Sequence, residues 1–375
     1  MKKKIAGAVA LATLGMTAHA QSSVTLYGLL DTGVAYTNNQ SGKSAWQESS
    51  GMVSNTVFGL NGSESLGGGL HAIFLLESGF NINSGSQSYK NTLFGRRSYV
   101  GLQSDRFGTV TLGRQYDSVV DYLGPIALAN NGDGNNLAAH PFDNDNVDDS
   151  FYIDNAVKYA SPNIAGLQFG AMYGFSNQAG GFSNNRAYSL GMSYGNGPLT
   201  LAAAYLQLNR GGATAGGALS ANDLPNFPAS RQRVMGAGGN YTFGPATVGI
   251  LWTHTMLDDT GATLLPGAMQ VLRFDNYELN AHYAPTSAIS LSGAYTFTDG
   301  RYSGAAGSGD PKWHQVTLMA DYALSKRTDV YAEAAYQHQF GVSADSPLGF
   351  AFINGLAPSS TNTQVAATAG IRHRF

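Results

Sequence analysis

The chain has 375 residues, with 48 glycines, 12 prolines and no cysteine, and only 12% of its residues are charged. The lack of cysteine excludes a disulfide scaffold, thiolate metal sites and cysteine nucleophiles. Low charge combined with 11% aromatic residues argues against an intrinsically disordered chain and against a helical bundle. A net charge of −3 argues against a nucleic-acid-binding protein, which would have an excess of basic residues.

Residues 1–20 have the three parts of a secretory signal peptide. Lysines at 2–4 form a positive start, a small-residue apolar segment follows, and 18–20 read Ala-His-Ala, a typical cleavage site. The apolar segment is too short to cross a bilayer as a helix. We therefore expect residues 1–20 to be removed during export and residues 21–375 to form one domain.

The remaining chain alternates between apolar and polar residues with a period of two, which is typical of strands with two different faces. In 276–283, the apolar row is Tyr277, Leu279, Ala281 and Tyr283, and the polar row is Asn276, Glu278, Asn280 and His282. The segments 24–36, 69–80, 314–324, 329–337 and 365–375 alternate in the same way. Apolar rows with aromatic ends suit lipid, and polar rows suit a wet lumen, so the pattern predicts a membrane barrel.

The connections alternate between short and long, which separates two ends of the barrel. Short turns fall at 65–68, 104–107, 161–163, 195–198, 243–245, 284–286 and 324–327. Long polar segments fall at 38–51, 81–91, 118–150, 177–185, 210–230, 257–269, 300–311 and 341–361. Seven turns and eight long connections predict an all-β fold, a sixteen-stranded antiparallel transmembrane barrel with long extracellular loops and short periplasmic turns. Sixteen strands leave an aqueous channel.

Residues 118–150 form the longest connection and show no strand pattern. This segment contains six aspartates and neither lysine nor arginine. A connection this long in a compact domain is expected to be functional or disordered. Composition alone leaves two alternatives open, an acidic surface loop and a loop folded into the lumen.

Six segments carry a resemblance that covers nearly all of the exported chain. They are SSVTLYGLLDTGVAY (22–36), LGGGLHAIFLLESGFN (66–81), LFGRRSYVGLQSDRFGTVTLGRQYD (93–117), DNAVKYASPNIAGLQFG (154–170), DYALSKRTDVYAEAAYQH (321–338) and AGIRHRF (369–375). The chain resembles the general diffusion porins of Gram-negative outer membranes, most closely the β-proteobacterial trimeric kind. The resemblance implies a homotrimer embedded in outer-membrane lipid and lipopolysaccharide. It also implies that 118–150 is a constriction loop inside the lumen, and that Phe375 is a signal for the outer-membrane assembly machinery.

The resemblance also implies a basic wall facing that loop. Arg96, in FGRRSYVGL, matches a wall arginine of the family, whereas Val57 and Tyr152 stand where the family usually has two more. Lys158 shares the polar face with Tyr152 and is a candidate to replace part of the missing charge. Arg114 also matches a family arginine, but alternation groups it with the apolar Val110 and Leu112 and so predicts that it faces a subunit interface.

We expect the acidic side of the constriction to come from the loop and the residues that start it. These candidates are Asp117, Asp121, Asp133, Asp143 and Asp145. With only one or two bases opposite this row of acids, the focused field should weakly favour cations.

Catalytic, cofactor and metal motifs give no competing signal. Residues 191–195 fit G-x-S-x-G, but they lie inside an alternating segment and lack the strand-turn-helix context of a nucleophile elbow. Residues 143–149 resemble the start of a calcium loop, yet Val147 and Asp148 break its pattern, so only a loose cation site stays open. We therefore expect a passive channel for small hydrophilic solutes and ions, with no enzyme activity, cofactor, metal or nucleic-acid partner. The alternatives are a solute-specific channel and, further off, a barrel enzyme.

Overall fold

The computed structural model describes residues 22–89, 91–131, 136–260, 269–305 and 307–375. The expected signal peptide lies outside these residues. The strands are β1 (Ser22–Gln40), β2 (Lys43–Ser50), β3 (Val57–Gly67), β4 (Leu70–Gly79), β5 (Arg97–Ser104), β6 (Gly108–Gln115), β7 (Ile153–Ala160), β8 (Leu167–Gly174), β9 (Arg186–Asn196), β10 (Leu199–Asn209), β11 (Ala229–Phe243), β12 (Ala246–Thr260), β13 (Met269–Tyr283), β14 (Ile289–Gly304), β15 (Gly307–Gly309), β16 (Lys312–Ala323), β17 (Thr328–Phe340) and β18 (Thr363–Arg374).

Among the described residues, helical structure is confined to short pieces between β6 and β7. They are α1 (Ser118–Tyr122) and four 3-10 turns, η1 (Gly124–Ile126), η2 (Leu128–Asn130), η3 (Asn136–Ala138) and η4 (Pro141–Asp143). Across the described ranges, no helix has the length and apolar content that a membrane crossing demands.

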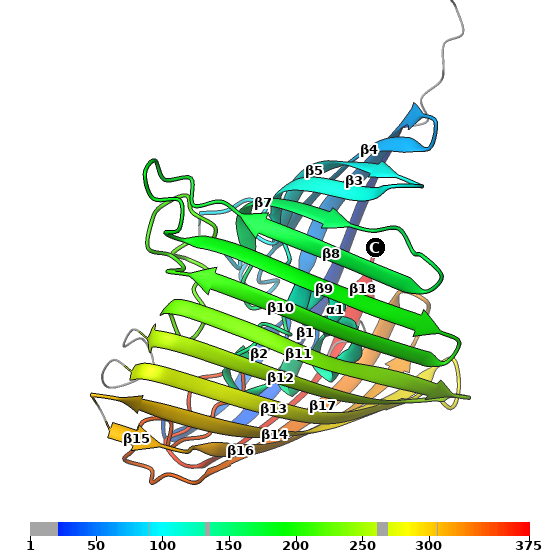
Figure 1. The fold of residues 1–375 in the computed structure, drawn as a ribbon. Coiled ribbons are helices and arrows are strands. Elements are labelled where there is room, and N and C mark those ends of the chain that lie inside the picture. The colour runs from blue at the N-terminus through cyan, green and yellow to red at the C-terminus, as the bar shows by residue number, and fades with distance from the viewer. Residues whose placement is uncertain (1–21, 90, 132–135, 261–268, 306) are drawn as a thin grey trace, which may run out of the picture.

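The strands close into a barrel because the first and last of them pair. β1 pairs antiparallel with β18, from Leu29 opposite Arg374 to Thr37 opposite Ala366, and its other edge pairs with β3 and β2. β2 and β15 are short additions to the loops beside β1 and β14, so sixteen strands form the wall. The predicted sixteen-stranded antiparallel barrel is confirmed, with long connections at one end and short turns at the other (Figure 1).

Alternation along each strand sorts side chains between the outside and the lumen. On β13, Tyr277 and Leu279 point outward and are 49% and 58% exposed, whereas Asn276 and Glu278 between them are buried. This inside-out arrangement is stable in a membrane, since the apolar row meets hydrocarbon and the backbone polar groups are paired between strands. The exposed apolar rows therefore mark the lipid-facing surface.

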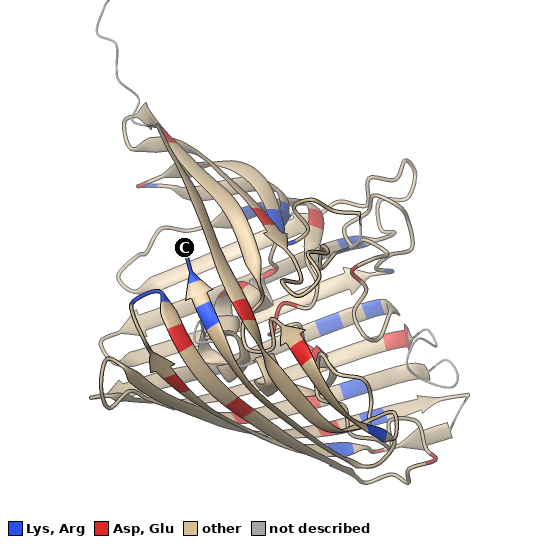
Figure 2. Ribbon diagram, turned by 180° about the vertical axis from the view of Figure 1, so that it is seen from behind, with Lys and Arg blue, Asp and Glu red and all other residues tan. Residues whose placement is uncertain are grey.

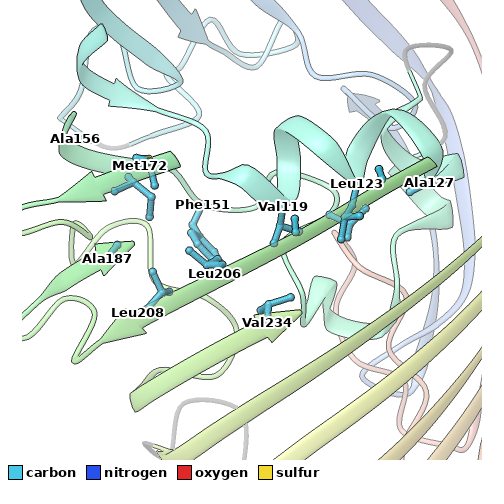
Figure 3. Packing of buried hydrophobic residues seen from close by; sticks show 14 of the residues in the cluster. Val119, Leu123, Ala127, Phe151, Ala156, Met172, Ala187, Leu206, Leu208 and Val234 are labelled. Atoms are coloured by element: carbon cyan, nitrogen blue, oxygen red, sulfur yellow. The ribbon is translucent and has the colours of Figure 1, made fainter. Parts of the chain in front are cut away.

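Residues 118–150 are from here on called the inner loop, and their described parts, 118–131 and 136–150, run inside the barrel rather than over its rim. The helix α1 packs against β9 and β10, η1 against β11 and β12, and η3 against β16 and β17. Val119 and Leu123 are buried against Leu206 of β10 and Val234 of β11 (Figure 3). Of the two alternatives for this loop, the structure therefore has the inward one.

Two glycines in the wall make room for the start of the inner loop. A Cβ at Gly170 would lie 2.6 Å from the Tyr122 hydroxyl oxygen, and one at Gly191 would lie 2.2 Å from the Tyr122 ring. Any larger residue there would displace α1 from the wall. The missing side chains therefore fix how closely the loop approaches β8 and β9.

An aromatic cluster anchors the far part of the inner loop. The Phe142 ring stacks on Phe352 at 4.9 Å between centroids, and it meets the edges of Phe227 and Trp313 at 5.1 and 5.5 Å. Phe274 of β13 joins the same buried group. Because these rings come from three loops and two wall strands, the cluster fills one side of the lumen near the long-loop end.

Candidate functional site

A cavity of about 200 Å³ lies between the inner loop and the wall formed by β1 and β3 to β5. Val57, Glu77 and Arg97 line it from the wall strands, and Asp148 and Asp149 line it from the loop. We call it the charged cavity. A second cavity of about 270 Å³ shares Asn55, Asn136, Asp148 and Asp149 with it, so the two are adjacent.

Arg96 and Arg97 hold one shared carboxylate on the wall. Arg96 Nε donates to Glu77 Oε1 at 3.1 Å, and Arg97 Nη2 donates to Glu77 Oε2 at 2.7 Å. Arg96 also donates to Asp149 Oδ2 at 3.2 Å and to the Tyr116 hydroxyl at 2.8 Å. Charge-assisted pairs of this kind fix the guanidinium groups in position. The positive charge of the wall is therefore largely neutralised where it stands.

Tyr152 occupies the position where the resembling family has a wall arginine, and it acts as an anchor instead. Its hydroxyl donates to Asp149 Oδ1 at 2.9 Å, while its ring stacks on Tyr116 at 5.3 Å between centroids. The Arg96 and Arg114 guanidinium groups lie 5.4 and 4.9 Å from the centre of the same ring. Tyr152 is fully buried, so it joins the loop to the wall and does not itself line the charged cavity.

Asp148 and Asp149 are neighbours with different surroundings. Asp149 accepts hydrogen bonds from Arg96, Tyr116 and Tyr152. No such bond or ion pair reaches the Asp148 carboxylate from the part of the chain that the structure describes. Burial raises the pKa of Asp148, and the nearby charges of Asp143 and Asp149 raise it further. Asp148 is thus an acid that faces the cavity and ionises at a higher pH than a free carboxyl.

Lys158 lies on the inner face of β7 but is paired with the inner loop. It forms an ion pair with Asp121, and its Nζ also donates to the Tyr116 carbonyl oxygen at 3.0 Å. The two side chains predicted for opposite sides of the constriction therefore neutralise each other. Neither lines the charged cavity.

Alternation predicts that Arg114 faces a subunit interface, and the structure shows that its guanidinium group is bound within its own chain. The pairing of β6 with β7 shifts between Gly113 and Gln115, with the extra residue on β7, while Thr111 and Gln115 remain buried on one face of β6. Gly113 has a φ of +134°, a conformation that suits glycine. Arg114 is buried, donates to the Gly95 carbonyl oxygen at 2.8 Å and to Asp154 Oδ1 at 2.7 Å, and pairs with Asp223.

Two of the predicted acidic residues, Asp117 and Asp143, stabilise the loop itself and do not face the charged cavity. Asp117 caps α1 by accepting from the Val119 amide at 2.6 Å. Asp143 accepts from the amides of Asp148 and Ser150 at 3.0 and 3.2 Å. Both carboxylates are almost completely buried. The prediction missed this because backbone amides inside a folded loop leave no pattern in the sequence.

Asp145, also predicted to face the pore, belongs to a buried clamp between the inner loop and the wall. His140 Nδ1 lies 2.7 Å from Asp145 Oδ2, and His140 Nε2 lies 2.9 Å from Glu278 Oε2 on β13. Burial lowers the pKa of His140, but the charges of Asp145 and Glu278 outweigh it and raise the pKa to about 10. The histidine is therefore a cation held between two carboxylates. Asp133, the remaining acidic candidate, lies outside the described residues.

The sequence analysis did not predict four charged residues that line the cavity, and the sequence contained a local signal only for Arg97. The four are Glu77, Arg97, Asp148 and Asp149. Val100 and Leu102 point outward on β5, so alternation alone places Arg97 inward. The family pattern had directed attention to Arg96, which precedes the strand. The roles of Glu77, Asp148 and Asp149 depend on contacts between distant segments and had no local signal.

Phe375 lies at the short-turn end beside the first strand. Its amide donates to the Gly28 carbonyl oxygen at 3.0 Å, and the Gly28 amide donates back at 3.1 Å. The ring is 40% exposed on the barrel wall. Elsewhere in the described ranges, no group of three or more histidine, aspartate or glutamate side chains is arranged to hold a metal ion.

Comparison with known proteins places these features in context. The profile of a Gram-negative porin family matches residues 7–340. An outer membrane porin protein of Bordetella pertussis is 31% identical, and Outer membrane porin protein 32 of Delftia acidovorans is 32% identical, each across the full length of both chains.

Solved structures agree with the architecture. An anion-selective porin from Comamonas acidovorans matches with a TM-score of 0.73 and 26% identity, covering 95% of this chain and all of the other. A trimer form of OmpT, an outer membrane protein of Vibrio cholerae, matches with a TM-score of 0.66 at 16% identity, covering 94% of this chain and 99% of the other. The second likeness concerns the fold alone.

Proposed function

The chain belongs to the Gram-negative porin family and is an outer-membrane channel, and we propose that it passes small hydrophilic solutes and ions by diffusion with a weak preference for cations. The observation that supports this preference is the charge around the charged cavity. Two basic residues, Arg96 and Arg97, line it together with three acidic ones, Glu77, Asp148 and Asp149. The lining thus carries one net negative charge when all are ionised.

Pairing also decides which of these charged side chains remain available to a passing ion. It leaves a larger difference between acidic and basic groups than their numbers alone indicate. Both arginines are bound to Glu77, and Arg96 is also bound to Asp149, whereas Asp148 faces the cavity without a partner among the described residues. In a narrow passage with low-dielectric walls, an unpaired charge dominates the local potential. A passing cation therefore finds a free carboxylate, while a passing anion finds arginines that are already occupied.

The second candidate is a preference for anions. It is favoured by the Comamonas acidovorans porin, which is named as anion-selective and shares 26% identity with this chain. Arg96 and Arg97 would carry this preference if Asp148 stayed protonated, because its raised pKa shifts ionisation to higher pH. The two candidates make opposite predictions about how selectivity changes with pH.

The test is the zero-current potential of the reconstituted channel across a KCl gradient, measured from pH 5 to pH 9. We expect a cation preference that grows with pH as Asp148 ionises. Asp148→Asn should lose the pH dependence and shift the permeability ratio toward anions by about twofold, since a unit charge several ångströms away in water contributes about 0.5 kcal/mol. The matched control is Asp105→Asn, on the exposed turn between β5 and β6.

Each outcome of this experiment decides one part of the proposal. Anion selectivity across the whole pH range would keep the channel and reject the role of Asp148. A conductance that falls with one uncharged solute but not with others of similar size would favour a solute-specific channel. Absence of conductance in a folded protein would reject diffusion through the charged cavity.

We propose further that the channel assembles as a homotrimer and performs no catalysis. The trimer form of OmpT is a precedent for this assembly in a protein of the same fold, and the family supports a channel rather than an enzyme. Phe375 is proposed as the contact for the assembly machinery, because it ends the last strand at the short-turn end with its ring on the outer wall. Truncation of Phe375 should lower the yield of inserted barrel, measured as the fraction with heat-modifiable migration in gels.

A further inference from the structure

The charged cavity contains one acid and one base that each keep an unused hydrogen-bonding position. Asp148 lines the cavity with a carboxylate that has no partner among the described residues. Arg97 donates to Glu77 through Nε and Nη2, at 3.1 and 2.7 Å, while its Nη1 has no hydrogen bond within the part of the chain that the structure describes. Figure 2 shows acidic and basic positions close together on the strands and the loop of this part of the lumen. The cavity thus offers an acceptor for a cation and a donor for a carboxylate.

Arg97 is the more accessible of the two arginines in the cavity. Its side chain is 27% exposed, against 7% for Arg96. Arg96 is also bound to Asp149 and to the Tyr116 hydroxyl. The Arg97 guanidinium group lies 5.0 Å from the centre of the Tyr116 ring, and its two bonds to Glu77 fix its orientation. Its Nη1 is therefore a donor that is held in place and still available.

A free anion gains little from this donor. Glu77 neutralises the charge of Arg97, so the anion meets an N–H group without a net positive charge behind it, and the ionised Asp148 repels it. A carboxylate that is joined to an ammonium group behaves differently. The ammonium group binds Asp148 and favours its ionised form, and it holds the carboxylate near Arg97 at a high effective concentration. A solute that carries both groups therefore combines two contacts that are weak separately.

The remaining lining of the charged cavity suits a small aliphatic group. Leu29, Val53, Val57 and Ala129 line it beside the charged side chains. Contact with an aliphatic side chain would remove apolar surface from water on both partners. The volume of about 200 Å³ equals that of about seven water molecules at about 30 Å³ each, which is close to the size of a small amino acid such as valine. A solute of this size reaches the charged and the apolar parts of the lining together.

We propose that the charged cavity binds small aliphatic α-amino acids in their zwitterionic form as they pass. The ammonium group binds the Asp148 carboxylate, the carboxylate accepts from Arg97 Nη1, and the side chain packs against Val53 and Val57. This inference rests on the proposed function, because it names a class of solute for the same passage. Dissociation constants on the order of millimolar are expected, since a channel site has to release what it binds.

The experiment measures block of the KCl current through single channels of the full assembled protein in planar bilayers at pH 8. The probes are valine, isobutylamine and isovalerate. Isobutylamine has the same side chain as valine without the carboxylate, and isovalerate has it without the ammonium group. We expect valine to reach half block at a concentration about tenfold lower than either of the other two, because only valine makes both polar contacts.

Two variants separate the two contacts. Asp148→Asn should raise the half-blocking concentration about fivefold for valine and isobutylamine, and should not raise that of isovalerate. Arg97→Gln should raise it by about the same factor for valine and isovalerate, and should leave that of isobutylamine unchanged. The matched controls are Asp105→Asn and Arg106→Gln, on the exposed turn between β5 and β6, which should change none of the three.

Equal block of the wild-type channel by valine and isobutylamine would overturn the proposal, because the cavity would then recognise a cation alone. An equal loss for all three probes in Asp148→Asn would also overturn it, since the effect of the substitution would then be steric. Heat-modifiable migration shows whether each variant is folded. If Arg97→Gln does not assemble, Asp148→Asn still decides, because the Asp148 carboxylate makes no bond within the described chain.

The KCl potential separates this inference from the proposed ion preference. Anion selectivity together with preferential block by valine would reject the cation preference and keep the amino-acid site. Cation selectivity together with equal block by valine and isobutylamine would keep the cation preference and reject the amino-acid site.

Discussion

The two sides of the lumen are built from the same kind of strand and yet have opposite character. Along β10 to β13, the inward residues include Leu206, Val234, Leu251 and Phe274, and the inner loop covers them. Along β4 and β5, the inward residues include Glu77 and Arg97, and a charged cavity separates them from the loop. We call these the packed side and the open side.

The difference teaches how a loop can narrow a channel without closing it. Apolar residues that face inward on the packed side remove their surface from water only when the inner loop covers them. Charged residues on the open side bind one another, as Arg96 and Arg97 bind Glu77. Asp148 lines the cavity without a partner among the described residues, and covering it completely would be costly because it is an unpaired acid. The inner loop therefore covers wall residues with which it packs or pairs, including Glu278 of β13, and leaves a cavity beside Glu77 and Arg97.

The largest expected effect on the difference between the two sides comes from removing Phe142, the centre of the aromatic cluster. Phe142→Ala should cost about 3–5 kcal/mol of the free energy that holds the inner loop on the packed side, because it leaves a cavity among buried rings. We expect a higher and noisier single-channel conductance as the loop moves away from the wall. The control is Phe182→Ala, a loop ring that is 62% exposed. Identical conductance in the two variants would show that other contacts hold the loop.

A second test of the packed side uses pH. The pKa of His140 is raised from 6.5 to about 10 in the folded channel, so its contribution is fully present below pH 6.5 and is lost as the pH rises through 10. That contribution is on the order of a few kcal/mol. We expect current noise to increase between pH 9 and pH 11, when His140 loses the proton that binds it to Asp145 and Glu278.

The matched variant for this test is His140→Gln, which keeps a polar side chain and cannot carry the charge. Its noise should be higher at pH 7 and should change less toward pH 11. A wild-type response that persists unchanged in His140→Gln would assign it to tyrosines or lysines instead.

The smallest expected effect concerns the open side and is a change in the permeability ratio. Val57→Arg adds a base to the lining of the charged cavity, at a position where the resembling family often has one. We expect the permeability ratio to move toward anions by about twofold, since the added charge acts through water and salt. Val57→Gln, similar in length without the charge, should leave the ratio unchanged. Zero-current potentials across a KCl gradient measure both.

The tyrosine on the same wall makes a useful contrast with this valine. Tyr152 is fully buried between Arg96, Arg114 and Asp149, whereas Val57 lines the cavity. An arginine at 152 would add a third base to a packed group, so it would disturb the fold before it changed selectivity. The two positions looked equivalent in the sequence because both fall on inward rows.

The sequence determined the barrel. Period-two rows, aromatic row ends and the alternation of seven short turns with eight long connections predicted sixteen strands, since each is a local response to lipid on one face and water on the other. The sequence also contains a local signal for the part of the wall that the inner loop covers. In 246–260 both rows contain apolar residues, such as Ile250 outward and Leu251 inward, as expected where a loop covers the inner face.

The tertiary structure decided which charges face the passage. Arg114 is bound by Asp154 and Asp223, which are distant in the chain. Asp143 and Asp145 are bound by contacts within the loop and with the wall. His140 and Glu278 are separated by 138 positions along the chain, and Arg96 and Asp149 by 53. Pairing between such distant residues depends on the closure of the whole barrel, so no local pattern of the chain could specify it.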